Sequence, residues 1–236
     1  MREAGRIIAE VFELLGKKIC PGIATAELDS AAEQLIVRRG GIPVCKGYHG
    51  FPSATCISVN EEVIHGIPGR RVLNEGDIVS VDLSVKLDGF CADAARTFPV
   101  GEISPELDKL LRVTEECMLA GAELALAGNR LGDIGNRIQT MAEDAGFGVV
   151  TDYVGHGIGR EMHEAPDVPN FGRAGRGLRI AGGMALAIEP MITFGAPAVR
   201  TLADGWTVVT LDGKPAAHYE NTVAVTPDGP RLLTVL

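Results

Sequence analysis

The chain has 236 residues, of which 46% are hydrophobic and 22% are charged, and its net charge is −9. This length is enough to bury a substantial core in one large domain or two small ones. The negative charge argues against nonspecific nucleic-acid binding, which needs clustered Lys and Arg side chains. No apolar stretch is long enough to span a membrane, because the run at 184–188 ends at Glu189 and Pro190.

The chain begins MREAGRIIAEVFELL, and charged residues interrupt its apolar positions within the first turns. This pattern predicts an amphipathic helix and argues against a signal peptide. The five cysteines form no CxxC motif, and their number is odd. Free thiols in a reducing cytosol are the natural interpretation, so we expect a cytoplasmic protein.

Hydrophobic periodicity predicts two helices over residues 2–39, followed by strands to about 99. Two further helices are expected over about 104–145, and strands from 148 to the end. Pairs of helices followed by runs of strands favour an α+β arrangement over the regular alternation of a parallel α/β sheet. The basic stretch from Arg173 to Arg179 lies among glycines and is interpreted as a solvated loop.

A faint internal repeat relates residues 20–40 to residues 126–146 at an offset of 106 positions. Each copy has a glycine before a predicted helix and another after it. The matched pairs are Gly22 with Gly128, Leu28 with Ile134, and Gly40 with Gly146. Chance likeness between two amphipathic helices is the alternative. If the repeat is real, a single domain of residues 1–236 has two halves, about 1–103 and 104–236, and a site between them would draw ligands from both.

The segment DIVSVDLSVKLDGFCADAARTF, residues 77–98, predicts a hairpin. Val and Leu alternate with Ser and Asp before Asp88-Gly89, which is a strong two-residue turn signal. With that turn, Asp82 faces Ala95, and Asp93 points to the same side as Ala95. Asp82 and Asp93 are then diagonal neighbours about 7–8 Å apart at the backbone. The bland alternative is a pair of exposed aspartates on an ordinary hairpin.

Five histidines and two glutamates add candidates for a polar site. His49 and His65 lie in GYHGFPSATCISVNEEVIHGIP, His156 and His163 in GHGIGREMHE, and His218 in AHYENTVAV. A satisfied core histidine is the usual explanation for any one of them. Glu189 in MALAIEPMITF and Glu220 in the strand-like HYENTVAV are carboxylates within apolar runs, so each must be paired or bound to metal.

Charge balance favours metal at this site. Four carboxylates in one cleft would repel one another and raise their own pKa values. Two divalent ions would neutralise them, at the spacing of about 3.5–4 Å that is found in two-metal hydrolytic sites. A ligand set of oxygens and one imidazole, with no thiolate, suits Mn, Fe(II) or Co better than a structural zinc site.

Five motifs together resemble the type I methionine aminopeptidases of peptidase family M24, almost from end to end. They are GYHGFPSATCISVNEEVIHGIP, VDLSVKLDGFCADAARTF, GHGIGREMHEAPDVPNFG, AIEPM and DGWTVVTLDGKPAAHYENTVAVT. The resemblance implies the pita-bread (creatinase/aminopeptidase) fold, with two pseudo-symmetric halves and antiparallel sheet flanked by helices. It implies a dinuclear ligand set, with Asp93 and Glu220 bridging. That set is Asp82, Asp93, His156, Glu189 and Glu220.

The resemblance also implies roles for residues around the metals. The histidine matching His65 contacts substrate and assists catalysis, and the one matching His163 hydrogen-bonds the scissile amide. Glu189 would move a proton toward the leaving amine. Phe51 stands where the family usually has tyrosine, and Met162 is a variable position. The positions that match the substrate pocket are Cys45, Tyr48, Phe51, Cys56, His65, Met162, His163 and Trp206.

The implied activity is hydrolysis of the initiator methionine from nascent proteins and peptides with a small second residue. In the family the attacking group is a hydroxide that bridges two divalent ions, here expected to be Co, Mn or Fe(II). The implied partners are the N-termini of nascent chains, with the ribosome as a further candidate, and no nucleic acid or membrane. A monomer is expected.

Two alternatives remain open at this point. Prolidases and aminopeptidases P share the fold and the ligands, although they usually carry an added N-terminal domain. A metal-free binding protein on the same fold is the alternative from another class, although such relatives typically lose ligands and this chain has all five. A comparison of Met-Ala-Ser with Ala-Pro substrates separates the two enzymes, and a metal analysis tests the binding protein.

Overall fold

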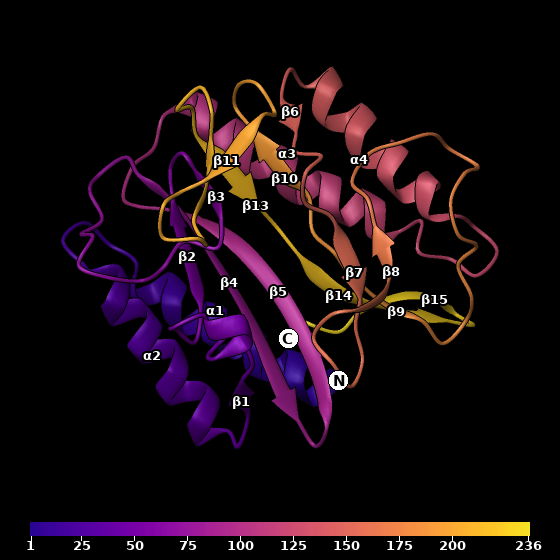
Figure 1. Cartoon of the computed structure of the whole chain (residues 1–236), viewed down its shortest axis with the longest axis horizontal. Helices are drawn as coiled ribbons and strands as arrows, with labels where there is room; N and C mark the ends of the chain where they lie inside the picture. Colours follow the sequence, from indigo (N-terminus) through magenta and orange to yellow (C-terminus); the bar gives the residue numbers. More distant parts are fainter.

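A computed structural model describes residues 1–236, and its two helix pairs flank a set of antiparallel strands (Figure 1). The helices are α1 (Arg2–Lys18), α2 (Thr25–Arg38), α3 (Pro105–Ala122) and α4 (Leu131–Asp144), with a short 3-10 turn at Tyr48–Gly50. The observed order of helices and strands agrees with the predicted α+β class.

The strands fall into the two regions predicted from the sequence. Before α3 they are β1 (Ile42–Pro43), β2 (Cys56–Val59), β3 (Glu62–Ile64), β4 (Ile78–Leu87) and β5 (Phe90–Pro99). After α4 they are β6 (Gly148–Val149), β7 (Gly155–Gly157), β8 (Glu164–Val168), β9 (Ala185–Ile188), β10 (Met191–Thr193), β11 (Val199–Thr201), β12 (Val208–Thr210), β13 (Ala216–His218), β14 (Asn221–Thr226) and β15 (Gly229–Leu232).

The strands pair in four small sheets. The first contains β1, β4 and β2, with β5 also paired to β4, and the largest runs β15-β14-β9-β7-β8. The other two are β13-β10-β6 and β11-β12-β3. The last of these joins β3 to strands near the end of the chain, so segments distant in sequence lie side by side around the middle of the molecule (Figure 1).

Local sequence explains where the helices begin and which faces they bury. The SPELD sequence starts α3, with the Ser104 hydroxyl accepting from the Leu107 N–H and Pro105 in the first turn. In α1, the buried side chains include Ile8 and Leu15, which are spaced two turns apart on one face. That face packs on β4 and β5. No helix combines the length and the apolar character needed to cross a bilayer.

The hydrophobic interior consists of two main clusters that follow the order of the chain. One contains 19 buried residues, all between Ala4 and Val100, under α1 and α2. The other contains 21, and all but Ile78 lie between 110 and 225. Each helix pair therefore covers its own core, and the polar centre described below lies where the two regions meet.

The helices α2 and α4 correspond at the predicted offset of 106 residues. Both have 14 residues, and the third residue of each, Glu27 or Asp133, has a carboxylate that accepts the N–H of the N-cap residue. Gly22 and Gly128 have φ of 95° and 102°, and each donates its N–H to a distant carbonyl, that of Leu73 or Ile180. These matches support the proposed division into an N-terminal half, residues 1–103, and a C-terminal half, residues 104–236.

The predicted hairpin register is confirmed. Asp82 pairs with Ala95 and Leu87 with Phe90, around a turn in which Asp88 and Gly89 both have positive φ. The valines of β4 are fully buried, and Ser80 and Ser84 are buried as well, at 3% and 0% exposure. The polar face of β4 therefore points into the protein and not into solvent, which is what a functional site on this strand requires.

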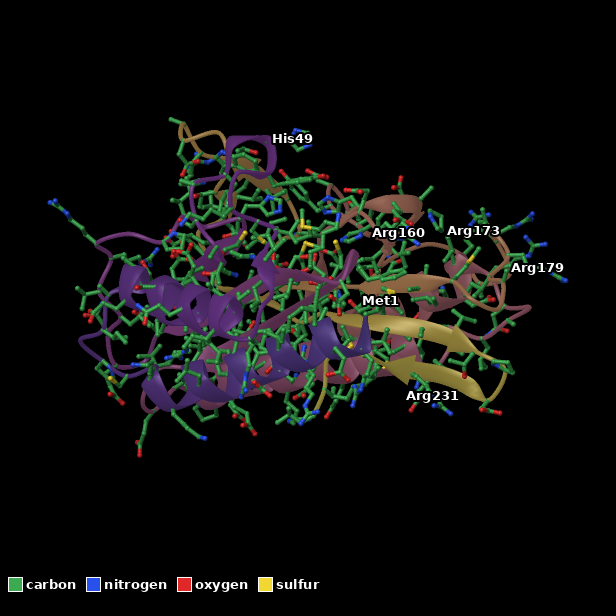
Figure 2. The ribbon with its side chains drawn as sticks, turned by 90° about the horizontal axis from the view of Figure 1, so that it is seen from below. Met1, His49, Arg160, Arg173, Arg179 and Arg231 are labelled. Atoms are coloured by element: carbon green, nitrogen blue, oxygen red, sulfur yellow. The ribbon has the colours of Figure 1, made fainter.

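The basic stretch is a solvated loop, as predicted. Residues 173–179 are all exposed. Figure 2 shows Arg173 and Arg179 extending outward at one end of the molecule. All five cysteines are free thiols.

Candidate metal centre

The N-terminal half contributes two carboxylates from the single β4–β5 hairpin. Asp82 and Asp93 lie on the buried polar face that the register predicts. Asp93 is pinned from the other half, because its N–H donates to the Thr222 hydroxyl at 2.9 Å and its carbonyl accepts from that hydroxyl at 2.8 Å. The Asp93 side chain is 5% exposed, and its Oδ1 has no hydrogen-bond partner.

The C-terminal half contributes one imidazole and two carboxylates from three separate segments. His156 lies in β7, Glu189 directly follows β9, and Glu220 directly precedes β14. The Glu220 N–H donates to the Ala95 carbonyl at 2.9 Å, and Arg96 donates to the Glu220 carbonyl. These bonds fasten the backbone of Glu220 to β5, beside Asp93.

Three of the five candidate ligands converge tightly. One ligand atom from each of Asp93, His156 and Glu220 lies within 4.8 Å of the others. Oδ1 of Asp93 and Oε1 of Glu220 are buried and have no hydrogen-bond partner. Orphaned carboxylate oxygens are costly in a protein interior, and a divalent cation would satisfy them. The donor set therefore fits a divalent metal.

All four carboxylates have raised pKa values, as is typical of acids clustered at a cation site. Burial raises the pKa of Asp82 to about 6 and the pKa of Glu189 to about 7. Burial, followed by repulsion from neighbouring carboxylates, raises the pKa values of Asp93 and Glu220 well above the ordinary range. Clustered buried acids behave in this way when no cation is near.

His156 has one ring nitrogen engaged with the backbone and the other available to a cation. Nδ1 lies 2.9 Å from the Gly157 carbonyl oxygen, a contact in which the ring nitrogen must donate. The lone pair is then on Nε2, which lies 3.4 Å from Oε1 of Glu189. A hydrogen bond that fixes the tautomer in this way is the usual support for a metal-bound histidine.

A cavity of about 510 Å³ opens onto this centre. Asp82, Asp93, His156 and Glu189 line it, whereas Glu220 lies beneath, with only 2% of its surface exposed. All eight residues predicted for the substrate pocket also line it, and they are Cys45, Tyr48, Phe51, Cys56, His65, Met162, His163 and Trp206. Their contact with substrate stays a prediction.

One wall of the cavity is apolar. Phe51 packs edge-on against Trp206 with ring centroids 5.1 Å apart, and Cys45 and Cys56 are buried in the same cluster. The wall joins the two halves, because Trp206 belongs to the segment before β12 and the others precede β3. Soft sulfur and aromatic surfaces suit an unbranched apolar side chain with a sulfur atom.

Two histidines face the cavity from opposite halves. His163 Nδ1 lies 2.7 Å from the Tyr48 hydroxyl, which can donate to it and leave Nε2–H available as a donor. His65 has a positive φ of 58° and packs edge-on against Tyr153. Burial lowers the pKa of His163 and lowers that of His65 to about 4, so both rings are uncharged near neutral pH.

His218, Asn170 and Tyr153 belong to the site, yet none was assigned a role from the sequence. His218 is 2% exposed and its Nε2 lies 3.7 Å from Oε2 of Glu189. Asn170 is fully buried and donates to the Glu189 carbonyl. Tyr153 lines the cavity. A signal for His218 was available, because a histidine two residues before a buried glutamate in a strand-like run shares its burial.

Comparison with known proteins gives a consistent result. The model of metallopeptidase family M24 matches residues 1–227. A methionine aminopeptidase of Clostridium perfringens is 58% identical over all of this chain and 95% of its own length. A methionine aminopeptidase structure from Thermotoga maritima superposes with a TM-score of 0.98 at 43% identity, covering 100% of this chain and 95% of that one.

The same fold recurs in a more distant enzyme. A prolidase from Pyrococcus furiosus superposes with a TM-score of 0.78 at 20% identity, covering all of this chain and 62% of that one. This likeness concerns the fold alone. The predicted pita-bread arrangement is therefore confirmed by structural neighbours of both kinds.

Proposed function

This chain belongs to metallopeptidase family M24, and on that premise we propose that it is a methionine aminopeptidase. It hydrolyses the N-terminal, initiator methionine of proteins and peptides whose second residue is small. The observation that carries the proposal is the centre itself, in which unpartnered buried carboxylate oxygens and an imidazole converge at the floor of a cavity with a sulfur-rich and aromatic wall.

Membership of a metallopeptidase family implies divalent metal. We propose that Asp82, Asp93, His156, Glu189 and Glu220 would hold two ions, with Asp93 and Glu220 shared between them. The mixed oxygen and imidazole donors favour Co, Mn or Fe(II). When bound, such ions lower the pKa of a water molecule and polarise a carbonyl group.

The side chains of the cavity would divide the remaining work. His163, oriented by Tyr48, would donate from Nε2 to the oxygen of the scissile carbonyl. His65 would contact the substrate from the opposite wall. Glu189 would take up a proton and pass it to the leaving amine.

The wall of Cys45, Phe51, Cys56 and Trp206 would receive the methionine side chain, with Tyr48 and Met162 at its edge. Phe51 is 3% exposed and places an apolar ring where a hydroxyl would otherwise need a partner. Uncharged aromatic and sulfur surfaces bind a thioether without leaving buried polar groups unpaired. This supports a preference for methionine over charged or hydroxylated first residues.

The proposed setting is the cytoplasm, where N-termini of nascent chains are the substrate and the ribosome is a candidate partner. Five free thiols and no disulfide fit a reducing compartment. A monomer suffices for the proposed chemistry, because one chain supplies all five proposed ligands.

The test compares Met-Ala-Ser with Ala-Pro-Ser, using protein stripped with a chelator and reconstituted anaerobically with Mn, Fe(II), Co or Zn. We expect no release of methionine from the stripped protein, recovery with at least one of Mn, Fe(II) and Co, and little cleavage of Ala-Pro. Full activity of the stripped protein would refute the metal proposal. Preferential cleavage of Ala-Pro-Ser would instead support a prolidase-type enzyme, which is the alternative with the same fold.

A further inference from the structure

His218 is a buried imidazole that the proposed chemistry leaves without a task. It is 2% exposed, and neither ring nitrogen has a hydrogen-bond partner. Buried polar side chains are nearly always paired, so an orphan of this kind calls for an explanation. The five proposed ligands and the two histidines at the cavity surface do not include it.

The backbone of His218 is fixed beside the centre by two hydrogen bonds. Its N–H donates to the Thr97 hydroxyl at 2.9 Å, and its carbonyl accepts from the same hydroxyl at 2.8 Å. The Ser80 hydroxyl oxygen in turn lies 2.9 Å from the hydroxyl oxygen of Thr97. Residue 218 is therefore tied to β5 and, through Ser80, to β4, the two strands that present Asp93 and Asp82.

Glu189 lies between two imidazoles. Its Oε1 is 3.4 Å from Nε2 of His156, and its Oε2 is 3.7 Å from Nε2 of His218. The second distance is longer than that of a formed hydrogen bond, and a small rotation of either side chain closes it. No hydrogen bond holds the Glu189 carboxylate, and Asn170 donates to the backbone carbonyl of Glu189.

The two imidazoles differ in the nitrogen that each commits. The bond from Nδ1 of His156 to Gly157 leaves Nε2 as a lone pair. Nδ1 of His218 has no partner, so nothing prevents the tautomer in which Nε2 carries the hydrogen. One ring is therefore prepared to bind a cation, and the other is prepared to donate to a carboxylate oxygen.

We propose that His218 is a positioning residue of the metal centre, which donates from Nε2 to Oε2 of Glu189 and holds that carboxylate in place. The inference rests on the proposed function, because it takes Glu189 as a ligand. Partners of this kind behind a ligand typically change metal affinity by about 10- to 100-fold when they are removed.

The test measures the affinity of chelator-stripped protein for Mn²⁺ by anaerobic titration calorimetry. His218→Leu keeps the volume but removes the donor, and we expect the affinity to fall about 10- to 100-fold. His218→Gln keeps an N–H donor, and we expect it to recover most of the wild-type affinity. If H218L does not fold, H218A takes its place in the same titration.

Three results would overturn the inference. Unchanged affinity in H218L would show that the ring does not support a ligand. Equal loss in H218L and H218Q would show that the imidazole itself binds metal, because an amide then fails to replace it. A change confined to the melting temperature of the metal-free protein would indicate a structural role, which also contradicts the proposal.

Asp93→Asn in the same titration separates this inference from the proposed function. If D93N loses affinity and H218L does not, only the role of His218 fails. If D93N binds Mn²⁺ as the wild type does, the proposed ligand set fails.

Discussion

The two halves of the molecule share a scaffold but supply the proposed metal ligands in different ways. In the N-terminal half, α2 is followed by the long β4–β5 hairpin, and both of its carboxylates come from those paired strands. In the C-terminal half, α4 is followed by many short strands, and His156, Glu189 and Glu220 come from three of these segments. The N-terminal half thus places both of its proposed ligands on one hairpin, whereas the C-terminal half places its three on separate segments.

This difference shows where the centre depends on the whole fold. The hairpin has its own register, but Asp93 is pinned by Thr222, and Glu220 is pinned by Ala95 and Arg96. Neither half holds its proposed bridging residue alone. The comparison predicts that removing a proposed ligand from either half lowers activity equally. The two substitutions should differ only in their effect on the stability of the surrounding fold.

The largest effect is expected for the proposed bridging carboxylates, one from each half. Asp93→Asn and Glu220→Gln should each lower kcat/KM on Met-Ala-Ser by at least about 10³-fold, because metal-assisted charge stabilisation supplies several kcal/mol. Asp88→Asn and Asp228→Asn remove exposed carboxylates from the β4–β5 and β14–β15 turns and should leave activity unchanged. Substantial activity in E220Q would mean that the centre works without its proposed bridging carboxylate from the C-terminal half.

The next effect concerns the donors at the cavity surface. His163→Ala should lower kcat by about 10²-fold, since this is the usual effect of losing one preorganised donor to a developing oxyanion. Tyr48→Phe should lower kcat less, because the imidazole of His163 then loses the hydrogen bond that orients it but keeps its own N–H donor. His49, which Figure 2 shows projecting from the surface, provides the control His49→Ala. A larger loss in Y48F than in H163A would contradict the assigned order.

A third effect is a pH-dependent gain in stability for the metal-free protein. Because burial raises the pKa of Glu189 to about 7, its folded form holds a proton to higher pH than its unfolded form. Stability is then lost as pH rises from about 4.5 to 7. Glu189→Gln removes this loss and should be more stable than wild type by on the order of 2 kcal/mol at pH 8, but not at pH 4.

Asp82→Asn makes the matched change in the other half. Burial raises the pKa of Asp82 to about 6, so its gain should be complete at a lower pH than that of Glu189→Gln. Urea denaturation of chelator-stripped protein between pH 4 and 8 measures both curves. Stability differences that do not vary with pH would contradict the raised pKa values.

The smallest effect tests the likeness of the two scaffolds. Gly22 and Gly128 have φ of 95° and 102°, and an added Cβ would meet no atom within 4 Å at either position. Gly22→Ala and Gly128→Ala should therefore lower the free energy of unfolding by the backbone strain alone, about 1 kcal/mol each. Gly182→Ala, also in open space but without a positive φ, is the control. Unequal losses would argue against equivalent positions.

The same contrast explains what the sequence could predict. The alternation in β4 and the Asp88-Gly89 turn determine which side chains share a face, so the placement of Asp82 beside Asp93 followed from local rules. The helices and the offset of 106 residues were also readable, because they depend on periodicity and glycine position.

The rest of the centre could not be derived in this way. Glu189 and Glu220 were recognisable as buried charges that needed partners, but which partners depends on contacts across the two halves. The burial of His218 could have been inferred from its place in the strand, but its distance to Glu189 depends on the tertiary fold. The resemblance to a family supplied the ligand set, and it assigned no role to His218, although that residue lies within one of the matching motifs.

The hydrogen bonds that fix the backbones of Asp93 and Glu220 also bear on how the chain folds during its synthesis. They join residues 129 and 124 positions apart in the chain. Contacts so distant in sequence form late, because the intervening loop must first lose its freedom. A growing chain can complete the β4–β5 hairpin long before residue 220 has been made. We therefore expect the proposed set of five ligands to be complete only near the end of synthesis or after it, when Glu220 joins Asp93.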